Sequence, residues 1–101
     1  MKVFLSELAE SKLLKLSEFL IENWNLKTRD EFIFIFTNKI KQISSQPKSC
    51  PKSIEFNDLY KCVVTTQTTF YYRILNQVNE IEIITIFDSR QDPNKLDKEI
   101  K

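Results

Sequence analysis

The hydrophobic residues of the first quarter of the chain follow first the pattern of a strand and then the period of an α-helix. Lys2–Leu5 is a short apolar run, and Ser6 after it is a residue type that caps helices. From there to about Asn23, apolar residues recur at spacings of three and four, with charged residues on the other side. The residues expected to face inward are Ala9, Leu13, Leu16, Leu20 and Trp24. The pattern predicts an opening strand followed by an amphipathic helix.

A second helix is predicted from residue 28 to residue 43. Thr28 and Glu31 have the spacing of a capping box, in which two side chains satisfy free backbone donors at a helix start. The run Phe32–Phe36 consists of β-favouring residues, but apolar positions continue beyond it at helical spacing without a turn signal. The residues that face inward in this phase are Phe32, Phe36, Ile40 and Ile43. With a short connection between them, the two helices form an antiparallel hairpin.

The period changes to two after the proline-containing segment 44–53. Alternation within residues 60–65, 70–75 and 81–88 predicts three strands, and the short connections at 67–68 and 76–79 predict an antiparallel meander. Asparagine is expected at the left-handed turn positions that glycine usually fills. The last strand is apolar on both faces up to Ile86, which predicts a central position. In strict alternation, one face carries Ile81, Ile83, Thr85 and Phe87, and the other carries Glu82, Ile84, Ile86 and Asp88.

These elements predict an α+β fold: a strand, an antiparallel helix hairpin and a three-stranded antiparallel meander. We expect one domain over residues 1–96 and a loose C-terminal tail at residues 97–101. The absence of glycine excludes a P-loop and a dinucleotide-binding turn, whose backbones approach phosphate closely. The absence of histidine excludes histidine-based nucleophile and metal sites, and two cysteines cannot form a four-cysteine zinc site. We therefore expect no metal and no cofactor.

Charge and hydropathy narrow the class of partner. Fifteen basic and fourteen acidic residues give a net charge of +1, which argues against a nucleic-acid binder with a wholly basic surface. No signal peptide and no membrane-spanning run of about 20 apolar residues is visible, so a cytoplasmic protein without membrane contact is expected. Cys50 and Cys62 are then expected to be reduced thiols, with Cys62 in the core and Cys50 exposed in a loop between Ser49 and Pro51.

The order of elements and three segments of the sequence resemble the RelE/ParE superfamily of bacterial toxins. The segments are Val3–Ala9, the aromatic-rich Thr69–Ile74, and Ile84–Pro93 with its Phe-Asp-x-Arg-Gln-Asp-Pro ending, which is typical of plasmid-stabilisation toxins. The resemblance spans about residues 2–96 and implies a toxin held inactive by a cognate antitoxin. RelE-like members cleave messenger RNA at the ribosome, whereas ParE-like members inhibit DNA gyrase and block replication.

The resemblance also implies candidate site residues. Arg73 matches the sheet arginine of RelE-like toxins, Arg90 matches the arginine after the last strand, and Lys61 is a third cation. These three residues would be catalytic in an endoribonuclease, with Tyr71 as a candidate acid. The chain lacks the lysine pair, the histidine and the C-terminal aromatic residue of such enzymes, and its net charge is small. These departures favour the ParE-like branch, in which Arg90 and Lys95 are expected to contact the target.

Other interpretations of the same residues stay open. Arg73 can simply pair across strands with Glu82 or Asp88, and Arg90 can join Asp88 and Asp92 in a turn. As exposed charges, both arginines would then contribute little to stability. The chain can also be a non-toxic binding module that keeps only its antitoxin-binding surface. The residues leave the oligomeric state open.

The partner surface is expected on the second predicted helix. Phe34 and Ile35 point away from its inward face, and apolar residues of this kind suit the amphipathic helix of an antitoxin tail. A tail that folds on binding could also add a strand at an open sheet edge. Neutralisation would then occur by covering the toxin.

Overall fold

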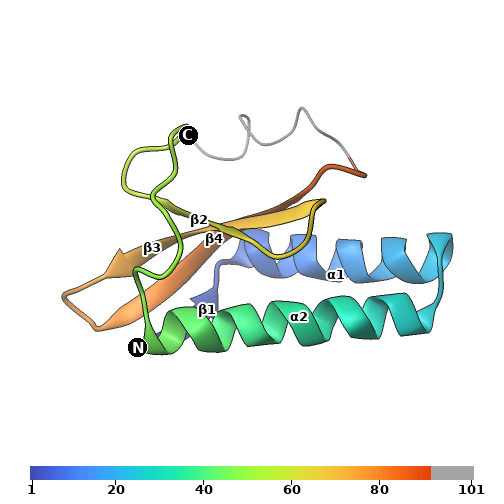
Figure 1. Ribbon diagram of the computed structural model, residues 1–101, viewed down its shortest axis with the longest axis horizontal. Helices are drawn as coiled ribbons and strands as arrows, with labels where there is room; N and C mark the ends of the chain where they lie inside the picture. Colours follow the sequence, from blue (N-terminus) through green and yellow to red (C-terminus); the bar gives the residue numbers. More distant parts are fainter. Residues whose placement is uncertain (92–101) are drawn as a thin grey trace.

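Two antiparallel helices pack on one face of a four-stranded sheet in the computed structural model, which describes residues 1–91 (Figure 1). The elements are β1 (Lys2–Leu5), α1 (Glu7–Asn23), α2 (Leu26–Ser45), β2 (Tyr60–Val63), β3 (Thr68–Leu75) and β4 (Glu80–Asp88). The strand order is β1-β4-β3-β2, with β1 parallel to β4 and the other pairs antiparallel. The predicted α+β class, the meander and the central position of the last strand are therefore confirmed.

The two helix starts show one correct and one incorrect prediction. Ser6 caps α1 as predicted, because its Oγ accepts a hydrogen bond from the Ala9 N–H at 3.0 Å. The capping box at Thr28 is wrong, since α2 begins two residues earlier. Asn25 is its N-cap and accepts from the Thr28 N–H at 2.8 Å, while Glu31 pairs with Lys27 on the surface at 4.0 Å. Asparagine is as strong a cap as serine, and it lies directly in the two-residue connection between the helices.

The core lies between the helix pair and the sheet. The buried residues that the helices supply are Ala9, Leu16, Leu20, Phe32, Phe36 and Ile43. Their principal partners on the sheet are Phe70, Tyr72, Ile81, Ile83 and Ile86. The helical phase predicted for residues 32–43 is thus confirmed. Trp24, however, is 52% exposed, because α1 ends at Asn23 and the backbone of Trp24 leaves the helical conformation.

A β-bulge in β4 overturns the strict alternation predicted for this strand. Tyr71 lies opposite Thr85 but Tyr72 lies opposite Ile83, so Ile84 is an extra residue. Beyond it the phase is reversed, and Ile86 and Asp88 share the helix-facing side with the residues before the bulge. Ser6, near the other end of the chain, holds the bulge through two hydrogen bonds. The Ser6 N–H donates to the Ile83 carbonyl at 3.0 Å, and the Ser6 Oγ donates to the Ile84 carbonyl at 2.7 Å.

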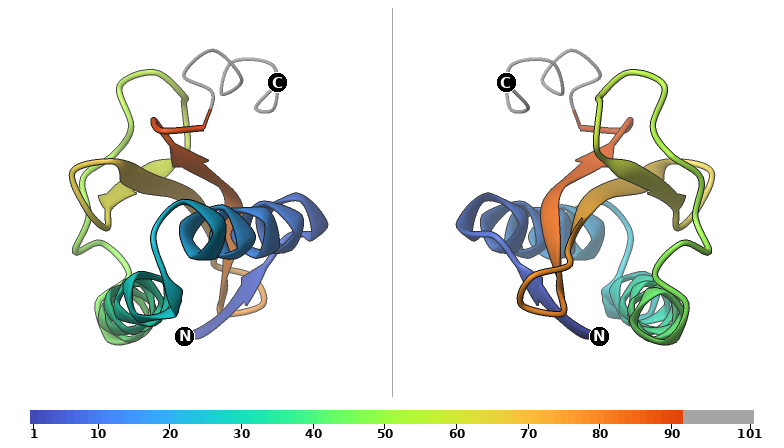
Figure 2. Two further views of the ribbon diagram at one scale, coloured as in Figure 1. Left: turned by 90° about the vertical axis from the view of Figure 1, so that its right-hand side faces the viewer. Right: turned by 90° about the vertical axis from the view of Figure 1, so that its left-hand side faces the viewer.

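Residues 46–59 cross over to the other face of the sheet (Figure 2). There Phe56 packs edge-on against Tyr71, with 5.4 Å between ring centroids. Tyr72 instead points to the helix side, where its hydroxyl donates to the Pro47 carbonyl at 2.7 Å. The β3–β4 turn places Asn79 at a φ of 56°, the left-handed role predicted for asparagine. Within residues 1–91, neither helix has the length and apolar character needed to cross a membrane.

Candidate functional site

Two of the candidate cations, Arg73 and Lys61, lie on the sheet face opposite the helices. Arg73 is exposed on β3 and pairs with Glu82 directly across the strands, with 3.6 Å between Nε and Oε1. Lys61 is half-buried on β2 and pairs with Glu55 at 3.5 Å. Hydrogen bonds from its own backbone and from Ser53, and then the charge of Lys61, lower the pKa of Glu55. Each sheet cation is therefore matched to a carboxylate, as the structural interpretation of Arg73 predicts.

Arg90 is held by several contacts, although the sequence predicts an exposed side chain. Its Nε donates to Asp88 Oδ1 at 2.9 Å, and its Nη2 donates to Asp88 Oδ2 at 2.6 Å. The backbone N–H of Arg90 binds the same carboxylate at 2.9 Å, and the Thr68 hydroxyl donates to it at 2.6 Å. The guanidinium also lies over the Trp24 ring, 5.4 Å from its centroid. The predicted pairing of Arg90 with Asp88 is therefore confirmed, whereas the expectation that Arg90 is an exposed charge is wrong, because the bulge turns Asp88 inward beneath it.

The electrostatics of this cluster follow from its burial and its hydrogen bonds. Asp88 is only 3% exposed, and burial by itself would raise its pKa. Hydrogen bonds from Arg90 and Thr68 outweigh that effect and lower the pKa of Asp88 below its usual value. The same hydrogen bonds to Asp88 raise the pKa of Arg90. The pair is thus fixed as carboxylate and guanidinium at neutral pH.

The three candidate catalytic cations do not converge on one point. Glu82, which lies opposite Arg73, and Asp88, which binds Arg90, are separated along the sheet by roughly 17 Å, because their partners on β3 are five residues apart. Lys61 lies nearer to Arg73, since it is opposite Tyr71 on the neighbouring strand. Tyr71 shares the face of Arg73 as predicted, but its side chain is buried beneath Phe56. Within residues 1–91, the proposed set cannot grip a single phosphate.

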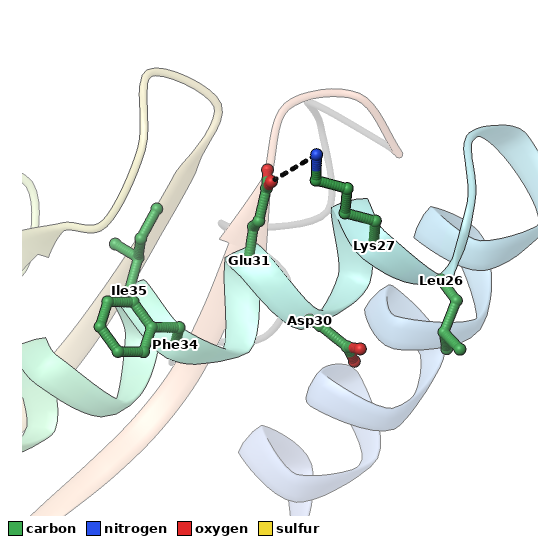
Figure 3. A pocket seen from close by; sticks show the side chains of 6 residues that line it. All are labelled: Leu26, Lys27, Asp30, Glu31, Phe34 and Ile35. Atoms are coloured by element: carbon green, nitrogen blue, oxygen red, sulfur yellow. Dashed lines mark ion pairs between the residues drawn. The ribbon is translucent and has the colours of Figure 1, made fainter.

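Phe34 and Ile35 lie on the solvent side of α2, beside an open apolar hollow of about 650 Å³ (Figure 3). Phe34 is 68% exposed and Ile35 is 38% exposed, in agreement with the predicted phase. The residues that line the hollow are Leu26, Lys27, Asp30, Glu31, Phe34 and Ile35. Further exposed apolar side chains occur nearby at the hairpin, including Trp24. An open apolar hollow with charged residues around it has the character of a protein-binding surface.

The other predicted residues either lie outside the described range or differ in burial from the prediction. Lys95, Asp92 and the tail at residues 97–101 lie outside the described residues. Sequence reasoning assigned Trp24 to the core and missed its contact with Arg90, because no local pattern links residues so far apart in the chain. Cys50 was expected to be exposed but is 6% exposed and packs in the core with Cys62. The proline-rich segment around it is not a free loop, since it pairs with β2.

The sequence matches, over residues 3–93, the family described as the ParE toxin of the type II toxin–antitoxin system parDE. The chain belongs to the ParE toxin family. Among solved structures, this ParE-family chain is similar to one described as a chromosomal ParDE toxin–antitoxin system from P. aeruginosa. The TM-score is 0.73 and the identity 11%, with 87% of this chain and 95% of that chain covered. No curated protein matches the sequence. The predicted superfamily and fold are thus confirmed.

Alanine substitutions at the two arginines of this ParE-family chain are expected to have unequal effects on stability. Arg73→Ala removes an exposed ion pair worth about 0–1 kcal/mol. Arg90→Ala leaves the buried Asp88 carboxylate without its cation and should lower the free energy of unfolding by about 2–3 kcal/mol. Urea unfolding followed by circular dichroism measures both. Equal losses would show that the Arg90–Asp88 pair contributes no more than a surface pair.

Proposed function

We propose that this chain is a toxin that inhibits DNA gyrase by binding it, without catalysing a reaction, and that a cognate antitoxin neutralises it in the bacterial cytoplasm. Membership of the ParE toxin family supports the toxin role. The observation that carries the choice of mechanism is the separation of Arg73 from Arg90 along the sheet. Inhibition by binding requires only a surface complementary to the target. It does not require an acid, a base and a phosphate-binding group that converge on one point.

The alternative, a ribosome-dependent endoribonuclease, has little chemical support in these residues. Metal-free RNA cleavage needs a base for the 2′-hydroxyl, an acid for the leaving oxygen and cations near one phosphate. Arg73 and Lys61 share a face, but each is matched to a carboxylate, and Tyr71 is buried. Arg73 is better explained by its ion pair with Glu82 across the strands, and Lys61 by its ion pair with Glu55 in the segment before β2.

We further propose that the antitoxin docks an amphipathic helix over the hollow on α2. Phe34 and Ile35 would supply the apolar contacts, and Lys27, Asp30 and Glu31 would form the charged rim. The hairpin carries most of the large apolar side chains that are exposed within residues 1–91. An antitoxin that covers this surface would explain why such a small chain exposes so many large apolar side chains.

The target-binding residues are proposed to follow β4, at Arg90 and Lys95. Arg90 is clamped by Asp88 and seated on Trp24, so the direction in which the chain leaves the sheet is fixed at this point. Under this proposal Arg90 acts partly as a positioning residue and Lys95 as a direct contact.

Induced expression of the chain is expected to stop DNA synthesis before it affects translation. Incorporation of labelled thymidine and methionine, followed in parallel after induction, measures the order of the two losses. Purified protein added to DNA gyrase and relaxed plasmid should block supercoiling, since binding to the enzyme is the proposed mechanism. Co-expression of the antitoxin encoded beside the toxin is the control that should restore growth.

Two results would contradict this proposal in different ways. Early loss of methionine incorporation, with messenger RNA cut at codon boundaries, would favour the endoribonuclease. Growth that continues normally with the folded protein present would favour a binding module without toxicity. Arg73→Ala then serves as a matched variant, because only the endoribonuclease mechanism predicts that it abolishes toxicity.

A further inference from the structure

The segment that contains Cys50 runs antiparallel to β2. The Ser53 N–H donates to the Leu59 carbonyl and the Lys61 N–H donates to the Pro51 carbonyl, both at 2.8 Å. These two bonds flank the bridge between Lys52 and Tyr60. In an antiparallel pair the residue numbers change by equal and opposite steps. Continued by two positions beyond this isolated bridge, the register places Cys50 opposite Cys62.

The type of pairing brings the two sulfur atoms close together. Lys52 and Tyr60 form a non-hydrogen-bonded pair, since the ladder bonds lie on either side of them. Cys50 and Cys62 occupy the next position of the same type in that register. In a regular ladder the Cα atoms of such a pair lie about 4.5 Å apart, within the range that a disulfide spans. Both cysteines are free thiols buried in the same core cluster, and Cys50 is among the causes that raise the pKa of the Cys62 thiol.

We propose that Cys50 and Cys62 form an oxidation site, in which a low-molecular-weight disulfide converts the two thiols into an intramolecular disulfide. The inference does not depend on the toxin's target. It rests on the register and on the shared place of the two thiols in the core cluster. The product ties the segment after α2 covalently to β2 at the edge of the sheet.

The exchange proceeds in two balanced steps. The Cys50 sulfur, deprotonated, attacks the external disulfide, forms a mixed disulfide and releases one external thiolate, which takes up a proton. The Cys62 thiol then gives up its proton to solvent, attacks the Cys50 sulfur and expels the second external thiolate, which is protonated in turn. The protein loses two electrons and two protons, and the external disulfide gains them as two thiols.

The surroundings of the two thiols set this order. Cys50 lies outside the strands and retains a small exposed area, and the exposed Lys48 and Lys52 on either side attract an anionic reagent such as oxidised glutathione. Burial, and then the hydrogen bond with Cys50, raises the pKa of the Cys62 thiol to about 12. The second step is therefore slow at neutral pH and accelerates as the pH rises.

The test is incubation of the folded full-length protein with oxidised glutathione, followed by acid quenching and mass spectrometry. Wild type should lose the mass of two hydrogen atoms, retain no alkylatable thiol and recover both thiols on reduction. A tryptic digest without reduction should contain the peptide of residues 49–52 linked to the peptide of residues 62–73. The closed loop should raise Tm by roughly 10 °C.

Cys50→Ser and Cys62→Ser are matched controls that change one sulfur to oxygen. Each should acquire at most one glutathione, with no rise in Tm. Wild type that keeps both thiols, or that stops at the mixed disulfide, would overturn the proposal. Linked peptides that form only after the chain is unfolded in urea would overturn it as well. Because the digest uses wild type alone, the test holds even where a serine variant does not fold.

Discussion

Phe34→Asp is expected to weaken antitoxin binding at least about thirtyfold while the free protein still folds. Phe34 is 68% exposed, so its loss removes no core packing. In the proposed complex the ring is the central aromatic anchor, and such residues cost about 2 kcal/mol or more on truncation. A carboxylate in the same place adds the cost of burying a charge in an apolar contact without a partner.

Calorimetric titration of the purified chain with the antitoxin tail measures this effect, and circular dichroism of the free variant reports its fold. Ile54→Asp is the matched control, because Ile54 is 97% exposed on the segment between α2 and β2, outside the hollow on α2. Unchanged affinity of the Phe34 variant would show that the antitoxin docks elsewhere. An equal loss with both variants would point to a general effect of added negative charge.

Asp88→Ala is expected to lower the free energy of unfolding by about 3 kcal/mol at neutral pH. The change leaves the Arg90 guanidinium and the buried Thr68 hydroxyl without the acceptor that now binds both. Asp88→Asn keeps the shape and part of the hydrogen bonding, so its loss should be smaller. Glu82→Gln is the control at the surface pair with Arg73, where a change below about 1 kcal/mol is expected.

The contribution of Asp88 should also depend on pH in a defined direction. Its pKa is lower in the folded chain than in the unfolded chain. The stabilisation is therefore fully present above the unfolded pKa of about 3.9 and is lost as the pH falls through the lower folded pKa. Urea titrations of wild type and Asp88→Asn should give a constant difference above about pH 5 that shrinks on acidification. A difference independent of pH would show that the carboxylate is not held as a charge.

The parts of the fold that sequence reasoning predicted are those encoded by local repetition. The helical phase of residues 32–43 was recoverable because apolar residues recur over several turns, although five β-favouring residues lie at its start. Ser6 was recognisable as a cap because it lies between a strand and an amphipathic run. The family could be recognised because its characteristic segments are spread over most of the chain and do not lie in a single helix or strand.

The errors concern features that depend on contacts between distant segments. The bulge at Ile84 is not visible in the sequence, because Ile83, Ile84 and Ile86 are all apolar and fit either phase of the alternation. The pairing of Arg90 with Asp88 is predictable from the sequence, but its burial is not, since only the shifted phase turns Asp88 toward the core. Cys50 was placed in an open loop, although it is covered by its own pairing with β2. The distance between Arg73 and Arg90 likewise depends on the pairing register of β3 and β4, which the sequence alone does not give.

The central place of β4 in the sheet has a consequence for synthesis on the ribosome. A nascent chain that stops before residue 80 has β1 and β3 but lacks the strand that joins them, and Ser6 has no carbonyl of Ile83 or Ile84 to bind. Contacts of such high contact order form late and slowly. The helices therefore emerge with their inner faces uncovered, and the nascent chain is open to chaperones until β4 completes the sheet.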